Sequence, residues 1–206
     1  MSFTRNGYGQ VEVNQMSAQK TGQIYASLPL DASVKVLQNG EFMFYDYATG
    51  KVTADDSTGV GEPMLVFNEI KLYEEPYRTS YKDFAMIRVG DNYVTSKLAT
   101  AKYGDGAETQ GVNANPGHTE YPYRMDGIAP RLFKTNIGDL YTTNMVETGD
   151  DITYAVGDKL QPVKNATTNT LQLKKATTVA DGMVWVVVKV YTMPDGQPGL
   201  KIQRVR

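Results

Sequence analysis

The chain has 206 residues, with 21 Lys and Arg against 23 Asp and Glu, a formal net charge of −2 and no cysteine. This length is sufficient for one large domain or two small ones, each with its own hydrophobic core. The balanced charge, without a basic cluster, gives no electrostatic attraction to nucleic acid or to an anionic membrane. The lack of cysteine excludes a disulfide framework, a thiolate metal site and a thiol nucleophile.

Residues 1–23 predict an extended N-terminal arm. They are rich in Gly, Asn, Gln and Ser, a composition that buries little surface by itself. Such an arm becomes ordered on a partner, whereas the alternative is a passive, frayed terminus. For a partner-binding arm, deletion of residues 2–20 should leave the β domains folded, with little change in thermal melting, but should strongly weaken attachment to the partner. For a passive terminus, attachment should be unchanged. The anchors that the arm offers to a partner are Phe3, Arg5, Tyr8, Val11 and Val13.

Residues 24–103 have the pattern of a β domain. Short runs such as "IYASLPL", "SVKVL", "EFMFYDY", "IKLY", "FAMIRV" and "NYVTSKL" combine β-branched and aromatic residues and are separated by turn residues. Asn39-Gly40 is a strong signal for a two-residue β-hairpin turn, and Thr49-Gly50 closes the next strand. These features predict successive hairpins.

The run "EFMFYDY" is unusually aromatic. Because side chains alternate along a strand, Phe42 and Phe44 share one face, and Met43, Tyr45 and Tyr47 share the other. One interpretation assigns the Phe face to the core and the Tyr face to a surface that meets a neighbouring protein. The other interpretation buries both faces in a two-layer core. The first adds Tyr45 and Tyr47 to the candidate contact residues.

Residues 104–130 are dominated by Gly, Pro, Asn and charged residues, which predicts a long loop or junction.

Residues 131–206 return to strand patterns in "DKLQPV", "TLQLKKAT", "MVWVVVKVY" and "LKIQRV", separated by turn residues. They are predicted to form a C-terminal β domain. The predicted fold class is therefore all-β, with one or two small barrel- or sandwich-like units and an extended N-terminal arm.

No motif for catalysis, phosphate binding or metal binding is recognisable. The single histidine, His118, lies in the long loop, and no serine lies in a nucleophile elbow. Adjacent acids point to opposite sides of a strand, so a pair is not by itself a two-carboxylate site. The pairs are Asp55-Asp56, Glu74-Glu75 and Asp150-Asp151. Calcium binding at the Asp turns is an alternative to simple solvated turns. The chain is predicted to have no enzymatic activity, cofactor or metal.

Three stretches carry a family resemblance. They are the polar opening "SFTRNGYGQVEVNQMSAQKTGQIYASLPL", the turn and strand Leu37–Gly50, and "VGDKLQPVKNATTNTLQLKKATT" followed by "MVWVVVKVY". Together they resemble auxiliary capsid proteins of tailed bacteriophages, the cement, decoration and head-fibre group. The resemblance implies a structural virion protein, made in the host cytoplasm, that binds and stabilises the capsid shell. Its implied partner is the major capsid protein, bound by many copies of this chain, either as monomers or as a homo-oligomer.

Two other functions remain alternatives. A receptor- or carbohydrate-binding β module of a head or tail fibre would use exposed aromatic rings as sugar platforms. Trp185 is a candidate platform, but its place in "MVWVVVKV" predicts that it lies in the core instead. A polysaccharide-degrading enzyme would need a pair of carboxyl groups held in different environments.

Overall fold

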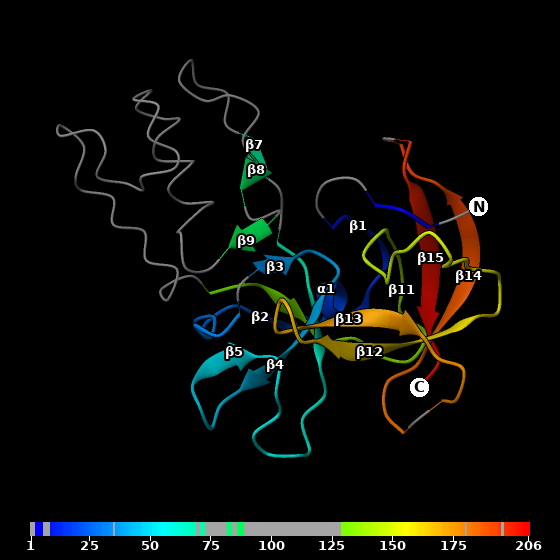
Figure 1. The fold of residues 1–206 in the computed structure, drawn as a ribbon. Coiled ribbons are helices and arrows are strands. Elements are labelled where there is room, and N and C mark those ends of the chain that lie inside the picture. The colour runs from blue at the N-terminus through cyan, green and yellow to red at the C-terminus, as the bar shows by residue number, and fades with distance from the viewer. Residues whose placement is uncertain are drawn as a thin grey trace.

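The computed structural model describes residues 3–5, 9–34, 36–68, 71–72, 82–83, 86–88, 129–179, 181–194 and 196–206. Tyr8, His118, the pair Glu74-Glu75, the strand expected in "NYVTSKL" and nearly all of the loop predicted at 104–130 lie outside the described residues. The described chain forms a strongly curled antiparallel sheet with one short helix (Figure 1). The predicted all-β class is confirmed.

The described residues form one helix and a series of strands. They are β1 (Val11–Gln15), α1 (Ser17–Thr21), β2 (Ile24–Tyr25), β3 (Val36–Gln38), β4 (Phe42–Asp46), β5 (Lys51–Thr53), β6 (Met64–Val66), β7 (Lys71–Leu72), β8 (Lys82–Asp83), β9 (Met86–Arg88), β10 (Leu132–Phe133), β11 (Leu140–Thr143), β12 (Lys159–Asn165), β13 (Thr170–Lys175), β14 (Trp185–Thr192) and β15 (Pro198–Arg204).

The main sheet has eleven strands, in the order β1-β11-β15-β14-β12-β13-β4-β6-β10-β2, with β5 paired to β4. Two further ladders join β3 to β9 and β7 to β8. Both halves of the chain therefore contribute to one sheet, instead of forming two separate β domains. They meet where Leu171 of β13 pairs with Phe42 of β4, and again where β10 pairs with β6 and β2.

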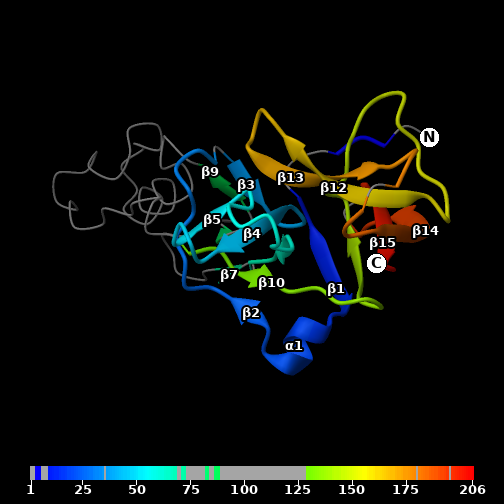
Figure 2. The same cartoon turned by 90° about the horizontal axis from the view of Figure 1, so that it is seen from below.

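The N-terminal segment is part of this sheet, which differs from the predicted extended arm. β1 pairs with β11, and α1 lies next to β1 (Figure 2). Phe3, Met16 and Ala18 lie in the main core. The burial of these residues could not be predicted from the composition of residues 1–23, because their apolar partners come from the C-terminal half of the chain.

Polar side chains also hold this segment in place. The N–H of Gln10 donates to Asn144 Oδ1 at 2.7 Å. Asp139, which is buried, accepts from the N–H and the hydroxyl of Ser17, each at 2.9 Å. Each such bond satisfies a group that would otherwise lose its hydrogen bonds to water. Residues 9–18 are thus attached to the turns that flank β11.

The turn at Asn39-Gly40 exists, but the expected hairpin does not. β3 pairs with β9, whereas β4 pairs with β5, β6 and β13. The Asn39 side chain exchanges two hydrogen bonds with the backbone of Asn68, at 2.9 and 2.8 Å. The Asn39 side chain therefore bonds to the protein interior. The turn is a buried corner between β3 and β4, which pair with other strands and not with each other. The turn at residues 47–50, in contrast, closes the predicted β4–β5 hairpin.

Two hydrophobic clusters lie on opposite sides of β4. Phe42 belongs to the main cluster with Trp185, and Met43 belongs to a second cluster with Leu37 and Val52. Both faces of this strand are therefore buried at its start, as the two-layer interpretation predicted. Met43 is fully buried, so it is not part of an exposed Tyr face.

Candidate interaction surface

A row of three tyrosines marks the end of β4. Tyr45 lies with its ring centroid 5.2 Å from that of Tyr25 and 5.2 Å from that of Tyr47. The Tyr45 hydroxyl accepts a hydrogen bond from the N–H of Ser27 at 3.0 Å, which fixes the middle ring. Tyr47 is 73% exposed, whereas the other two are half-buried. We call these three residues the tyrosine row.

A cavity of about 240 Å³ adjoins the tyrosine row. Its lining includes Tyr45 and Tyr47 together with the acidic residues Asp46, Asp56 and Glu62. Glu62 forms an ion pair with Arg204, and Asp56 accepts hydrogen bonds from its own loop, including the N–H of Gly61. The cavity therefore combines aromatic rings with carboxylates that are held in fixed positions.

Local donors keep two of these carboxyl groups ionised. The Ser57 hydroxyl, together with the N–H groups of Ala48 and Thr49, holds the pKa of Asp46 below its usual value. The hydroxyl and N–H of Thr58 do the same for the pKa of Asp56. Neither group is suited to be a general acid, which must retain its proton near neutral pH. The arrangement is suited to binding by aromatic contact and hydrogen bonding.

The arm residues named as anchors lie in quite different places. Phe3 is buried against Tyr154 in an edge-to-face contact with 5.1 Å between ring centroids. Val11 and Val13 are half-buried and pack against the main core. Arg5 is half-buried and donates to the Met145 sulfur. Of the described candidate contact residues, only Tyr47 is largely exposed.

Glu41 is a buried acid that the sequence did not single out. It is 1% exposed, and it accepts hydrogen bonds from the Gln38 N–H at 2.8 Å and the Thr170 hydroxyl at 2.9 Å. Burial raises the pKa of Glu41 to about 7, although these two donors and the charge of Arg5 act in the opposite direction. Glu41 lines neither of the cavities described here.

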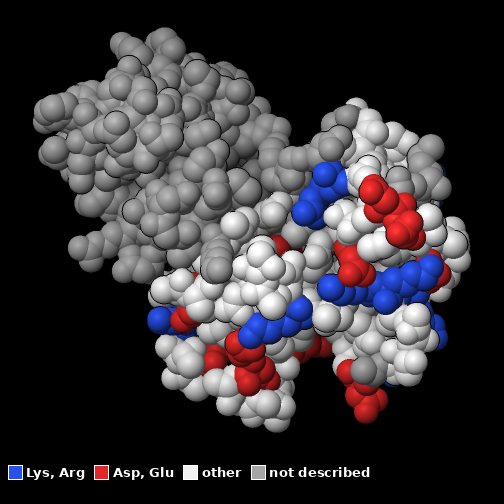
Figure 3. Space-filling view, in the orientation of Figure 1, with Lys and Arg blue, Asp and Glu red and all other residues white. Residues whose placement is uncertain are grey.

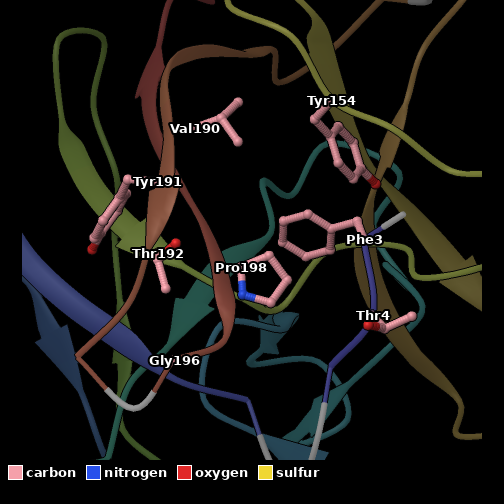
Figure 4. A pocket seen from close by; sticks show the side chains of 8 residues that line it. All are labelled: Phe3, Thr4, Tyr154, Val190, Tyr191, Thr192, Gly196 and Pro198. Atoms are coloured by element: carbon pink, nitrogen blue, oxygen red, sulfur yellow. The ribbon is translucent and has the colours of Figure 1, made fainter. Parts of the chain in front are cut away.

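A second cavity, of about 430 Å³, lies between the N-terminal segment and the β14–β15 hairpin. Figure 4 shows Phe3 and Tyr154 on one side of it and Val190, Tyr191 and Thr192 on the other. The Tyr154 hydroxyl donates to the Glu147 carbonyl at 2.7 Å, so that ring is fixed in place. The lining is uncharged and combines aromatic and aliphatic side chains with the two threonines Thr4 and Thr192.

The adjacent acids Asp55 and Asp56 have different partners on the surface. Asp55 binds Lys164 at 2.6 Å, while its neighbour Asp56 turns toward its own loop, so the two do not form one site. On the face shown in Figure 3, acidic and basic side chains are interspersed. Among the described residues, no group of three or more His, Cys, Asp or Glu side chains is placed to hold a metal ion.

Trp185, the candidate sugar platform, is fully buried in the main core, as its sequence context predicted. In the part of the chain that the structure describes, no helix has the length and apolar character needed to span a membrane. No family model, no curated protein and no solved structure matches this chain.

Proposed function

We propose that the chain is a structural virion protein that binds the capsid shell of a tailed bacteriophage and reinforces it, as cement and decoration proteins do. The observation that carries this proposal is the tyrosine row, which is fixed at Tyr45 and exposed at Tyr47. Tyrosine combines a large apolar ring with a polar tip and is enriched at protein interfaces. A ring that is already ordered loses little conformational entropy when it binds.

The chemistry of the acids supports a binding role over hydrolysis. The pKa values of Asp46 and Asp56 are lowered, and Glu41, whose pKa is raised, lines neither described cavity. Because the N-terminal segment packs within its own chain, the proposed shell contact is made by the folded body. The partner is the major capsid protein, and many copies occupy each shell.

The test uses particles of the encoding phage prepared without this protein. Purified protein is added, bound and free fractions are separated by sedimentation, and electron microscopy locates the bound copies. The intact protein should saturate at a fixed number per shell, and Tyr47→Ser should bind at least about tenfold more weakly. Ile137→Ser, at a similarly exposed apolar residue in the turn between β10 and β11, is the matched control. Absence of binding by the intact protein would refute the proposal.

Carbohydrate binding by a fibre module is the second candidate, and the cavity beside the tyrosine row favours it. Exposed rings can stack on a sugar, and the carboxylates of Asp46 and Asp56 can accept hydroxyl hydrogen bonds. A glycan array separates the two functions. Selective retention of a glycan that Tyr47→Ser abolishes, without binding to shells, would establish this second function instead.

A further inference from the structure

Part of β14 lacks a strand on one side. β12 pairs with β14 only at Val186 and Trp185, and Val187 then bonds to the backbone of residues 157 and 158. From Val188 to Thr192, the only strand beside β14 within the described residues is β15. Strand edges of this kind can pair with another chain, and natural proteins usually protect them.

The phase of the β14–β15 ladder shows which main-chain groups are free. The Met193 N–H donates to the Gln197 carbonyl at 2.7 Å, which makes these two residues a hydrogen-bonded pair. Because hydrogen-bonded and non-hydrogen-bonded pairs alternate, Val190 and Thr192 direct their N–H and C=O groups away from β15. Pro198, which has no N–H to donate, lies opposite Thr192 and agrees with this phase.

Exposed apolar side chains border this edge. Val188 and Val190 are 43% and 41% exposed, and Val156, in the turn bonded to Val187, is 69% exposed. Val190 and Thr192 share one face of β14 and line the cavity next to Phe3 and Tyr154. An added strand would find main-chain partners at the edge and an uncharged cavity, lined in part by aromatic rings, for a side chain.

The opposite face of the hairpin carries a cross-strand pair of like charges. Lys189 of β14 lies directly opposite Lys201 of β15. Like charges in this position destabilise a sheet. No described residue forms an ion pair with either lysine. The nearby Glu12 carboxylate instead accepts a hydrogen bond from the Tyr191 hydroxyl at 2.8 Å. The two lysines lack a negative partner within the described chain.

We propose that the open edge of β14 binds an extended strand of a partner polypeptide, with apolar side chains beside Val190 and Thr192 and acidic side chains beside Lys189 and Lys201. Main-chain hydrogen bonds would supply affinity, and the alternating side chains would supply specificity. Charge argues against a second copy of this chain as the occupant. Edge-to-edge self-pairing would place both Lys189–Lys201 pairs on one face of the joined sheet.

The probes are two blocked eight-residue peptides, one alternating valine with glutamate and the other alternating valine with lysine. They are titrated into the full chain, and binding and amide hydrogen exchange are followed by NMR. The glutamate peptide should bind at least about tenfold more tightly and slow exchange of the Val190 and Thr192 amides. The double variant Lys189→Glu, Lys201→Glu should reverse the preference between the peptides.

Val190→Pro removes an outward N–H that has no partner strand among the described residues, so it should abolish peptide binding with little change in thermal melting. Val190→Thr keeps that N–H and is the matched control. If neither peptide protects these amides, or if both bind equally, the proposal is overturned.

Sedimentation of the protein alone tests whether a second copy occupies the edge. A dimer that Val190→Pro disrupts, with the two amides protected before peptide is added, would assign the edge to a second copy.

Discussion

The Thr170 hydroxyl donates to Oε1 of Glu41 at 2.9 Å, across 129 residues of sequence, at a site closed to solvent. This bond joins the turn before β4 to the first residue of β13. It lies next to the pairing of Leu171 with Phe42, through which the sheet passes from one half of the chain to the other. An ionisable group is therefore buried where the two halves meet.

The pKa of Glu41 predicts a pH dependence of stability. This pKa is about 7 in the folded chain against a usual value of 4.5, so between these values the folded state binds more protons than the unfolded state. The free energy of unfolding should therefore fall as pH rises from about 5 to about 7, by up to about 3 kcal/mol, and then level off. Urea unfolding across this range measures the effect.

Glu41→Gln, which has no charge at any pH, should remove this fall. Acids with lowered pKa values, such as Asp31 and Asp158, lose their stabilising effect only below about pH 4, outside the measured range. An equal slope in the intact protein and in Glu41→Gln would show that another group titrates.

Two tyrosines, the fully buried Tyr141 and the half-buried Tyr154, should respond oppositely to loss of the hydroxyl. The Tyr141 hydroxyl is buried without a hydrogen-bond partner among the described residues, whereas that of Tyr154 donates to the Glu147 carbonyl at 2.7 Å. Tyr141→Phe should therefore stabilise the protein by up to about 1 kcal/mol, and Tyr154→Phe should destabilise it by about 1 kcal/mol. Thermal and urea unfolding of the two variants provides the comparison. Destabilisation by Tyr141→Phe would contradict the expected order.

The N-terminal segment should be required for stability. Phe3 lies in the main core, so Phe3→Ala should cost about 3 kcal/mol. Deleting residues 2–20 removes β1 and most of α1 and should prevent cooperative unfolding altogether. Lys20→Ala, at an exposed residue of α1, is the control and should change stability by less than about 0.5 kcal/mol. A truncated chain that melts like the intact chain would restore the interpretation as an arm.

Two turn glycines should differ in their tolerance of alanine. Both have a left-handed backbone, with φ of 94° at Gly40 and 68° at Gly50. A Cβ at Gly40 would lie 2.5 Å from Met145 Cβ, whereas a Cβ at Gly50 would meet no atom within 4 Å. Gly50→Ala should cost about 1 kcal/mol from backbone strain alone. Gly40→Ala should cost at least about 2 kcal/mol more, because the Met145 side chain must move. An equal loss of unfolding free energy in the two variants, measured by urea unfolding, would show that the chain around Gly40 moves at little cost.

Local patterns predicted the strands whose partners are close in sequence. The β12–β13 and β14–β15 hairpins follow from β-branched runs separated by turn residues, and "FMFYD" forms β4 as expected. β10 and β11 were missed, since they are short and lie among polar residues. The spacing of Val11 and Val13 is the same in a paired strand and in an extended arm, so it does not distinguish the two. Their strand partner, β11, lies far along the chain, which no local pattern reveals.

The candidate sites show the same limit. Tyr47 was recognisable because aromatic residues cluster around an exposed turn. Glu41 reads as an ordinary turn acid, and only its approach to Thr170 makes it buried. The run "MVWVVVKVY" predicts a strand, but the topology alone shows that part of its edge is unpaired. The like charges of Lys189 and Lys201 become neighbours only through the β14–β15 register.

The strand order has a consequence for synthesis on the ribosome. Among the described strands, β15 is translated after all the others, yet it lies between β11 and β14, and β11 in turn is the only described strand beside β1 in the main sheet. At about 5–20 residues per second, β1 waits roughly 10–40 s before the strands beyond β11 are complete. Until then the sheet beyond β11 is incomplete, so we expect the apolar residues of β1 to stay exposed on the nascent chain. Codon changes that slow translation of residues 144–198 should prolong this exposure.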